Sequence, residues 1–263
     1  MNTSREEIEK VRKFWDSRPC NIRHSKSEFG TVKYFQEVEE RRYYVEPHIR
    51  QFCEFDRWEN LKVLEIGCGI GTDGVNFARA GALYTGIELS TESLQICQDR
   101  FKLLGLNGEF IEGDAETADQ VLAGRTFDLI YSFGVIHHTP SIENALQAMR
   151  NLSEVGTQIK VMVYASNSYK QALINAGLEQ PEAQAGCPIA NSYSKEEAIK
   201  LFSNAGFRSI EVTQDHIFPY SIEEYKEYKY VKEPWFNAMP DEVFQAMKKN
   251  FGWHLLINSE VSN

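Results

Sequence analysis

The hydrophobic pattern from Leu61 onward alternates between two periods. Short, almost wholly apolar runs are separated by longer stretches in which apolar residues recur every three or four positions. A strand buried on both faces produces the first pattern, and an amphipathic helix produces the second. We therefore expect strands at 62–66, 83–88, 108–112, 127–132 and 158–164, with helices near 71–80, 91–104, 115–123 and 142–152. This alternation predicts an α/β fold with a parallel sheet covered on both faces.

The residues before this core predict a helical cap. Residues 5–15 and 34–53 have helical spacing of apolar positions, and Pro47 should interrupt the second stretch because its nitrogen carries no hydrogen to donate. We expect the chain to divide into a cap over residues 1–57 and a larger domain over residues 58–263.

The residues after this core predict two more strands. A helix should begin at Ser194, where Glu197 completes a capping box, and end at Gly206. Strands are expected at 208–216 and 253–260, separated by a long polar and aromatic helical region over 221–250. The total is a seven-stranded sheet with insertions near 166–193 and 217–250.

The glycine-rich turn after the first predicted strand fits two patterns. Gly69, Gly71 and Gly74 match GxGxxG, which is typical of dinucleotide-binding proteins. Gly67, Gly69 and Gly71 match [D/E]xGxGxG, with Glu65 as the acid. The first pattern would bury Glu65 unpaired within the strand, which is costly. The second leaves it at the carboxyl end of the strand, where open α/β sheets bind ligands and where it can accept hydrogen bonds from an ammonium group. We favour the second pattern.

Two further acids follow the next two strands. Glu88 closes the second strand and is placed to accept hydrogen bonds from two ribose hydroxyls, and Asp114 follows the third and can accept from the amine of adenine. Together with Glu65, they predict a site for an adenosine that carries a cationic amino-acid tail. A pyrophosphate would be poorly served by three carboxylates.

These motifs resemble those of a known family. "VLEIGCGIG", "GIELS", "EGDAE" and "FDLIYSFGVIHHTP" are similar to four motifs of class I S-adenosylmethionine-dependent methyltransferases, particularly the branch that acts on small molecules and includes quinone-biosynthesis enzymes. The similarity spans about residues 58–165, although "NLSEVGTQ" replaces the usual Pro-Gly-Gly turn before the fifth strand.

The resemblance implies a fold, a cofactor and a set of residues. The fold is a Rossmann-like, seven-stranded, mostly parallel sheet with an antiparallel last strand, under a helical N-terminal lid and with C-terminal insertions. The cofactor is S-adenosyl-L-methionine. Together with the glycine pattern, the resemblance gives these cofactor-binding residues: Glu65, Gly67, Gly69, Gly71, Glu88, Leu89, Asp114, Ala115, Ser132 and Phe133.

Three segments are candidates for the methyl acceptor's site. His137 and His138 follow the fourth strand, and histidine can serve as a general base or a donor near neutral pH; the alternative is that they hold the loop. The second segment is the one that the resemblance places as a lid, where packing of aromatic side chains on the sheet is the alternative role. The third is the end of the fifth strand. We predict His137, His138 and Tyr44 as catalytic residues and Tyr43, His48, Tyr164 and Asn167 as substrate-binding residues.

Composition and charge limit the classes of molecule that we expect the protein to bind. The formal net charge is −10, and because residues 1–60 hold 12 basic and 12 acidic side chains, the whole deficit falls on residues 61–263. Nucleic-acid binders use basic surfaces, so we expect no nucleic-acid partner. No apolar stretch reaches the length of a membrane span and the N-terminus does not look like a secretory signal, so we expect no membrane partner and a cytoplasmic location.

The cysteines indicate no metal site. Five are scattered along the chain without the short spacings of zinc or redox motifs, and Cys20 with His24 forms a single isolated pair. We therefore expect reduced thiols and no metal.

The leading hypothesis is an enzyme that transfers a methyl group from S-adenosylmethionine to nitrogen or oxygen of a small metabolite under a helical lid. One alternative keeps the cofactor and changes the acceptor to RNA or protein. Another is a non-catalytic, cofactor-binding scaffold protein. The sequence leaves the acceptor, the need for a general base and the oligomeric state open.

Overall fold

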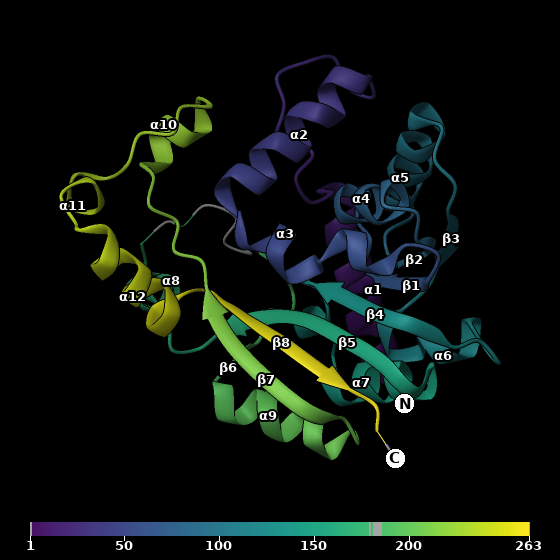
Figure 1. The fold of residues 1–263 in the computed structure, drawn as a ribbon. Helices are drawn as coiled ribbons and strands as arrows, with labels where there is room; N and C mark the ends of the chain where they lie inside the picture. The colour runs from purple at the N-terminus through teal and green to yellow at the C-terminus, as the bar shows by residue number, and fades with distance from the viewer. Residues whose placement is uncertain (1, 179, 181–185, 263) are drawn as a thin grey trace.

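One sheet organises the molecule. The computed structural model describes residues 2–178, 180 and 186–262, and its strands lie in the order β3-β2-β1-β4-β5-β8-β7 (Figure 1). In this described part, β8 runs antiparallel to both neighbours and the other strand pairs are parallel. The prediction of a mostly parallel sheet with an antiparallel last strand is confirmed. The strands are β1 (Lys62–Ile66), β2 (Leu83–Glu88), β3 (Glu109–Glu112), β4 (Phe127–Phe133), β5 (Ser153–Ala165), β7 (Arg208–Asp215) and β8 (His254–Glu260).

Strand β5 is longer than the sequence pattern predicts. It begins at Ser153 instead of residue 158, and its pairing with β4 shifts register between Phe127 and Leu129. Gly156 adopts a φ of +97° in this extension, where its N–H donates to the carbonyl of Val261 at 2.8 Å. An unpredicted two-residue strand, β6 (Ser192–Tyr193), pairs with the far end of β5. The polar residues at the start of β5 are exposed, which is why their pattern does not indicate a buried strand.

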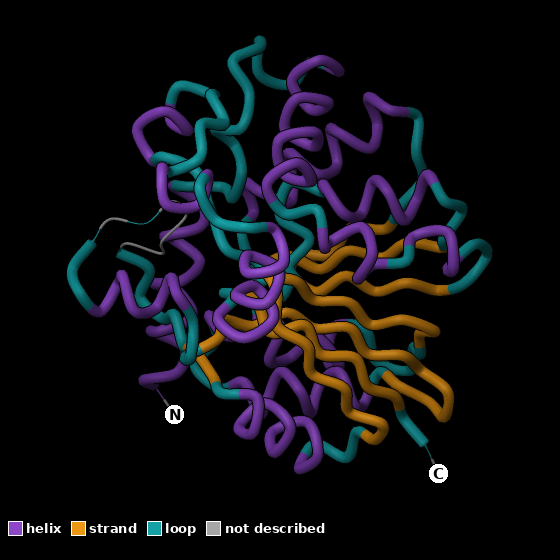
Figure 2. Tube along the Cα trace, turned by 60° about the vertical axis from the view of Figure 1, so that its left-hand side comes forward, coloured by secondary structure: helices purple, strands orange, loops and turns teal. Residues whose placement is uncertain are grey.

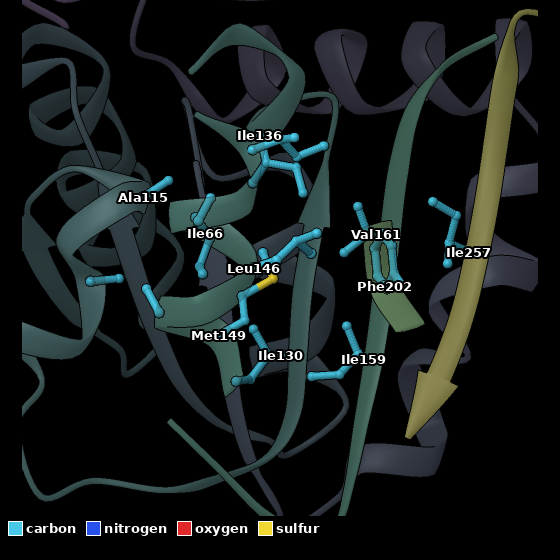
Figure 3. Close-up of a cluster of buried hydrophobic side chains, with 14 of the residues drawn as sticks. Ile66, Ala115, Ile130, Ile136, Leu146, Met149, Ile159, Val161, Phe202 and Ile257 are labelled. Atoms are coloured by element: carbon cyan, nitrogen blue, oxygen red, sulfur yellow. The ribbon is translucent and has the colours of Figure 1, made fainter. Parts of the chain in front are cut away.

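Helices cover both faces of the sheet (Figure 2). On one face, α6 (Ala118–Val121), α7 (Ile142–Asn151) and α9 (Lys195–Asn204) enclose an apolar core. Figure 3 shows Leu146 and Met149 of α7 packed near Ile130 of β4, with Phe202 of α9 near Val161 of β5. On the other face lie α3 (His48–Cys53), α4 (Thr72–Arg79) and α5 (Thr91–Leu104).

The second face carries the polar and aromatic side chains of the strands. Strand side chains alternate between faces, so Leu64 and Ile66 enter the first core while Glu65 points to the second face. The same alternation sends Met162 and Tyr164 of β5 to the second face. This asymmetry decides which side of the sheet can form a polar site.

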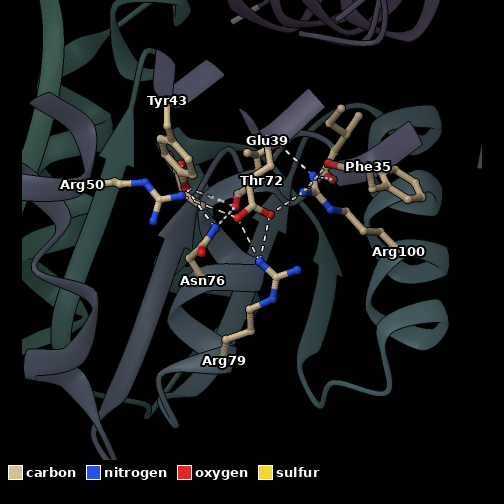
Figure 4. Close-up of polar contacts among 10 residues, drawn as sticks. Phe35, Glu39, Tyr43, Arg50, Thr72, Asn76, Arg79 and Arg100 are labelled. Carbon is tan, nitrogen blue, oxygen red and sulfur yellow. Dashed lines mark hydrogen bonds and ion pairs between the residues drawn. The ribbon is translucent and has the colours of Figure 1, made fainter. Parts of the chain in front are cut away.

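A buried ionic network holds the N-terminal helices to this face. The chain begins with α1 (Asn2–Ser17), and α2 (Val32–Val45) ends just before Pro47, as predicted. Glu39 of α2 accepts hydrogen bonds from Arg79 at 2.9 Å and from Arg100 at 3.3 Å, and Arg100 also donates to Thr72 Oγ1 at 2.9 Å (Figure 4). Since Thr72 lies just after the glycine turn, the network fixes α2 relative to that turn.

The predicted helical region over 221–250 is divided into short pieces. The structure has three short helices there, α10 (Ile222–Lys226), α11 (Pro234–Asn237) and α12 (Asp241–Phe251). Pro234 starts α11 and Pro240 immediately precedes α12, and a proline ends any helix that approaches it from the N-terminal side.

The remaining elements are short. The region 166–193 contains α8 (Tyr169–Asn175) and β6, while residues 179 and 181–185 within it lie outside the described part of the chain. The described residues also form the 3₁₀ helices η1 (Phe55–Trp58), η2 (Ala115–Thr117) and η3 (Ile136–His138). Among the described residues, no helix combines the length and apolar character needed to cross a membrane. The division into a cap and a main domain remains a prediction.

Candidate active site

A cavity lies where β1, β2 and β4 end and their following loops begin. The space it encloses, together with its open mouth, is about 1350 Å³. The predicted residues that line it are Glu65, Gly67, Gly69, Glu88, Leu89, Asp114, Ala115, Phe133, His138 and Tyr164.

The glycine turn presents bare backbone to the cavity. Gly67 and Gly69 adopt φ values of +78° and +52°, which favour glycine. A Cβ placed on Gly69 would have no heavy atom within 4 Å, so a ligand can approach its backbone closely. Gly71 has a different role, because a Cβ there would come within 2.6 Å of Cys97 Sγ. Gly71 allows α5 to pack against the turn and lies outside the cavity lining.

Glu88 connects β2 to the glycine turn. Its Oε2 accepts from the N–H of Gly69 at 2.8 Å and its Oε1 from the N–H of Ser90 at 2.9 Å. A carboxylate offers about four acceptor positions, so each oxygen keeps capacity for a ligand hydroxyl. Burial raises the pKa of Glu88.

Asp114 occupies the equivalent place after β3. Its Oδ1 accepts from the N–H of Glu116 at 3.0 Å and caps η2, and burial raises its pKa. Leu89 and Ala115, each next in sequence to one of these acids, also line the cavity. This end of the cavity therefore combines two carboxylates with apolar surface, which suits a planar, amine-bearing base above a ribose.

Glu65 is buried at the base of the cavity. Its Oε2 accepts a hydrogen bond from the hydroxyl of Tyr84 at 2.6 Å. Burial, and secondarily the charge of Asp73, hold the pKa of Glu65 well above its ordinary value. A cationic ligand group at this position would favour the ionised carboxylate.

Asp73 is a further acid of the cavity wall, which the sequence analysis missed. It lies in the first turn of α4 and accepts hydrogen bonds from the hydroxyls of Tyr43 and Tyr131, each at 2.8 Å. Arg42 also donates to it, at 2.9 Å. An acid two residues beyond the last glycine of the motif, at a helix N-terminus, is the sequence signal that could have identified it.

Helix α1 lies over the end of the cavity that Glu88 and Asp114 line, which we call the cofactor end. Val11 and Trp15 line the cavity from this helix. Arg12 donates to Glu112 Oε1 at 2.7 Å, and Asp16 accepts from the hydroxyl of Ser90 at 2.7 Å. These contacts hold α1 across the ends of β2 and β3.

The opposite end of the cavity has a different chemistry. Phe133, Met162 and Tyr164 of the sheet meet Trp253 and His254 from the start of β8. Tyr164 stacks on Trp253 with ring centroids 4.3 Å apart. This end is thus aromatic. His216 also lines it, as do Glu46 and Lys170, which the sequence analysis did not select.

The two adjacent histidines of η3 are both buried, but only His138 lines the cavity. Its Nδ1 lies 2.6 Å from the carbonyl of Ile189, which fixes the proton on Nδ1 and leaves Nε2 as a lone-pair acceptor. Burial lowers the pKa of His138 to about 4, so the ring is neutral at neutral pH. The ring centroids of His137 and Tyr164 are 3.9 Å apart. Burial holds the pKa of His137 well below its ordinary value.

The structure places several other predicted residues outside the cavity lining. Tyr44 is 55% exposed and contacts Tyr220 and Tyr230, because it projects from α2 away from the sheet. Its neighbour Tyr43 projects inward but is buried against Asp73. His48 lies behind the lining, and its Nε2 is 2.9 Å from His254 Nδ1.

Ser132 and Asn167 also lie outside the lining. The Ser132 hydroxyl donates to the carbonyl of Ile66 at 3.1 Å and so joins β4 to β1. Asn167 is exposed, and its carbonyl accepts from the side chain of Gln214 at 2.8 Å. Neither position brings a polar side-chain atom to the cavity.

Comparison with known proteins gives a family for the core. Residues 63–156 match the methyltransferase domain family. A ubiquinone biosynthesis O-methyltransferase from Erwinia tasmaniensis is 26% identical over 118 residues, which cover 45% of this chain and 48% of that protein. The enzyme of the same name from Rhizobium leguminosarum is 35% identical over 86 residues, covering 32% and 33%. The chain thus spans about half or less of these curated relatives.

Solved structures extend the likeness in fold over the whole chain. The magnesium protoporphyrin IX methyltransferase of Synechocystis, crystallised with bound S-adenosylmethionine, superposes with a TM-score of 0.60 at 15% identity and covers 100% of both chains. At this identity the likeness concerns the fold.

Proposed function

Because this chain contains a class I S-adenosylmethionine-dependent methyltransferase domain, we propose that it transfers a methyl group from S-adenosylmethionine to oxygen or nitrogen of a small molecule. The continuity of the cavity carries this proposal. One space joins the strand-end acids Glu65, Glu88 and Asp114 to the aromatic end formed by Tyr164 and Trp253. A cofactor held by the acids therefore points its reactive end at a second ligand.

The residues of the first end fit the cofactor. Glu88 accepts from the ribose hydroxyls, Asp114 from the adenine amine, and Glu65 offers its carboxylate to the ammonium group. The open side of Gly69 lets the backbone approach the ligand. When bound, S-adenosylmethionine supplies an activated methyl group on a sulfonium.

The rest of the cavity aligns the acceptor and excludes water. Methyl transfer requires the acceptor's lone pair to be in line with the bond from sulfur to the methyl carbon, and such alignment is a large part of the catalysis. Phe133, Met162 and Tyr164 form an apolar wall at this point. The N-terminal helices form the lid, with Val11 and Trp15 of α1 and Arg42 of α2 in the cavity wall. The name O-methyltransferase borne by the sequence relatives supports oxygen as the accepting atom.

His138 is the candidate base. Its neutral ring has an unshared pair on Nε2 and lines the cavity, so it can accept the acceptor's proton where one must be lost. We expect His138→Ala to lower turnover and leave cofactor binding intact.

Binding of the demethylated product and labelled methyl transfer test the proposal. S-Adenosylhomocysteine should raise the melting temperature and NAD should not. With trideuteromethyl-labelled cofactor, libraries of phenols, hydroxy acids and amines should yield a labelled small-molecule product by mass spectrometry. Methyl transfer to RNA or protein alone would show that the acceptor is a macromolecule and not a small molecule. Cofactor binding without transfer to any acceptor would indicate a non-catalytic scaffold protein.

A substitution tests the site assignment. Glu88→Ala removes two acceptor oxygens from the ribose, and hydrogen bonds to a charged group contribute about 1.5–3 kcal/mol each. We expect the dissociation constant for S-adenosylhomocysteine to rise at least about 100-fold by calorimetry. Glu92→Ala, an exposed glutamate at the start of α5, is the matched control. An unchanged affinity in Glu88→Ala would contradict the assignment.

A further inference from the structure

Three potential metal ligands converge at the aromatic end of the cavity. Glu46 follows α2, His216 follows β7 and His254 begins β8, and all three line the cavity. One ligand atom from each lies within 4.8 Å of the other two, and both histidines are buried. His254 Nε2 is 3.5 Å from Glu46 Oε1.

The spacing suits a single ion. Atoms bound to one ion at about 2.0–2.2 Å in tetrahedral geometry lie about 3.3–3.6 Å apart. The 3.5 Å between His254 Nε2 and Glu46 Oε1 fits this spacing, and a side-chain movement on the order of 1 Å completes the set. Two histidines and one carboxylate on one side of an ion form a common protein site for divalent transition metals.

A fourth residue supports ligation by His254. His48 Nε2 lies 2.9 Å from His254 Nδ1, and a metal-binding histidine almost always donates its other ring N–H to such a neighbour. With its proton on Nδ1, His254 donates to His48 and keeps a lone pair on Nε2 on the side of Glu46, as a shared ion needs; with its proton on Nε2, it donates toward Glu46 instead.

We propose that Glu46, His216 and His254 bind one divalent transition-metal ion, with His48 as the positioning residue for His254. Three protein ligands leave at least one coordination position open. The ligands line the cavity, so that position faces the space beside Phe133 and Tyr164.

The open position specifies a class of ligand, and this step rests on the proposed function. An acceptor that carries an oxygen, nitrogen or sulfur donor can coordinate the ion while its reacting atom faces the cofactor end. We therefore infer a metal-coordinating acceptor.

Metal binding is tested directly on the tag-free full chain, after dialysis against chelator, by titration with Co²⁺ and Zn²⁺. Calorimetry and the visible absorption of Co²⁺ should show one equivalent bound with histidine nitrogen ligands. His216→Asn is the preferred variant, because residue 216 has a φ of +73° that asparagine tolerates. We expect at least about a 100-fold loss of Co²⁺ affinity, since even outer partners of ligands contribute 10–100-fold.

Two further variants keep the test independent of folding. Glu46→Gln preserves size and should weaken Co²⁺ binding similarly, whereas Glu40→Gln, which changes an exposed glutamate on α2, should bind as the wild type does. No stoichiometric binding by the wild type would overturn the site, as would equal binding by the wild type, His216→Asn and Glu46→Gln. S-Adenosylhomocysteine binding, measured in parallel, depends only on the other end of the cavity, so failure of the metal site and failure of the proposed function are distinguishable.

Discussion

At the scale of single residues, Glu65 shows how burial can couple ligand binding to protonation. Burial raises its pKa, and a cationic ammonium beside it would lower the pKa again. Cofactor binding should then release protons at pH values between the ordinary and the raised pKa, and affinity should increase with pH across this window.

We predict that calorimetry of S-adenosylmethionine binding in buffers of different ionisation enthalpy shows release of up to one proton per site. Glu65→Gln keeps an acceptor for Tyr84 and removes the titration, so its binding should release less. Equal proton release by both proteins would show that Glu65 does not face the ammonium.

His138 makes a prediction about stability. Its pKa is about 4 in the folded chain and about 6.5 when unfolded. The unfolded state therefore binds more protons between these values, and stability falls as pH decreases from 6.5 toward 4. His138→Asn keeps a donor for the Ile189 carbonyl and removes this titration. Between pH 7 and pH 5 the free energy of unfolding should fall by about 2 kcal/mol less in the variant, measured by urea denaturation. Parallel pH dependences would contradict the neutral, buried state.

At the scale of elements, α1 covers part of the cofactor end, where Val11 and Trp15 line the cavity. We therefore expect release of a bound cofactor to involve movement of this helix. Two polar contacts of α1, Arg12 with Glu112 and Asp16 with Ser90, oppose that movement.

We predict that the double variant Arg12→Ala/Asp16→Ala accelerates dissociation of S-adenosylhomocysteine roughly tenfold. This is the effect expected when the hydrogen bond between Ser90 and Asp16 and the exposed ion pair between Arg12 and Glu112 are both lost. Stopped-flow fluorescence measures this rate. Lys13→Ala, on the exposed side of the same helix, should dissociate at the wild-type rate. An unchanged rate in the double variant would mean that α1 does not gate release.

At the scale of the whole molecule, segments from both ends of the chain complete one cavity. Residues 11–46 cover it on one side, while 216 and 253–254 close it at the aromatic end. The net charge of −10 disfavours a polyanionic acceptor, and the expectation of no nucleic-acid partner stays a prediction.

The sequence by itself determined the sheet and the placement of its strand-end acids. Buried strands and amphipathic helices impose their periods locally, and Glu65, Glu88 and Asp114 follow from where three strands stop. It missed the polar start of β5, where the local signal is weak, and it did not place the helix boundaries that prolines set within the helical region over 221–250.

Only the tertiary structure decided which side chains meet across long sequence distances. Tyr43 and Tyr44 are adjacent in sequence, yet one is buried on Asp73 and the other is exposed. Glu46, His216 and His254 share no motif, because their proximity comes from the antiparallel return of β8 beside β5 and β7. The hydrophobic period of a segment reports only which face of that segment is buried. Which distant residues come together depends on how the elements pack against one another.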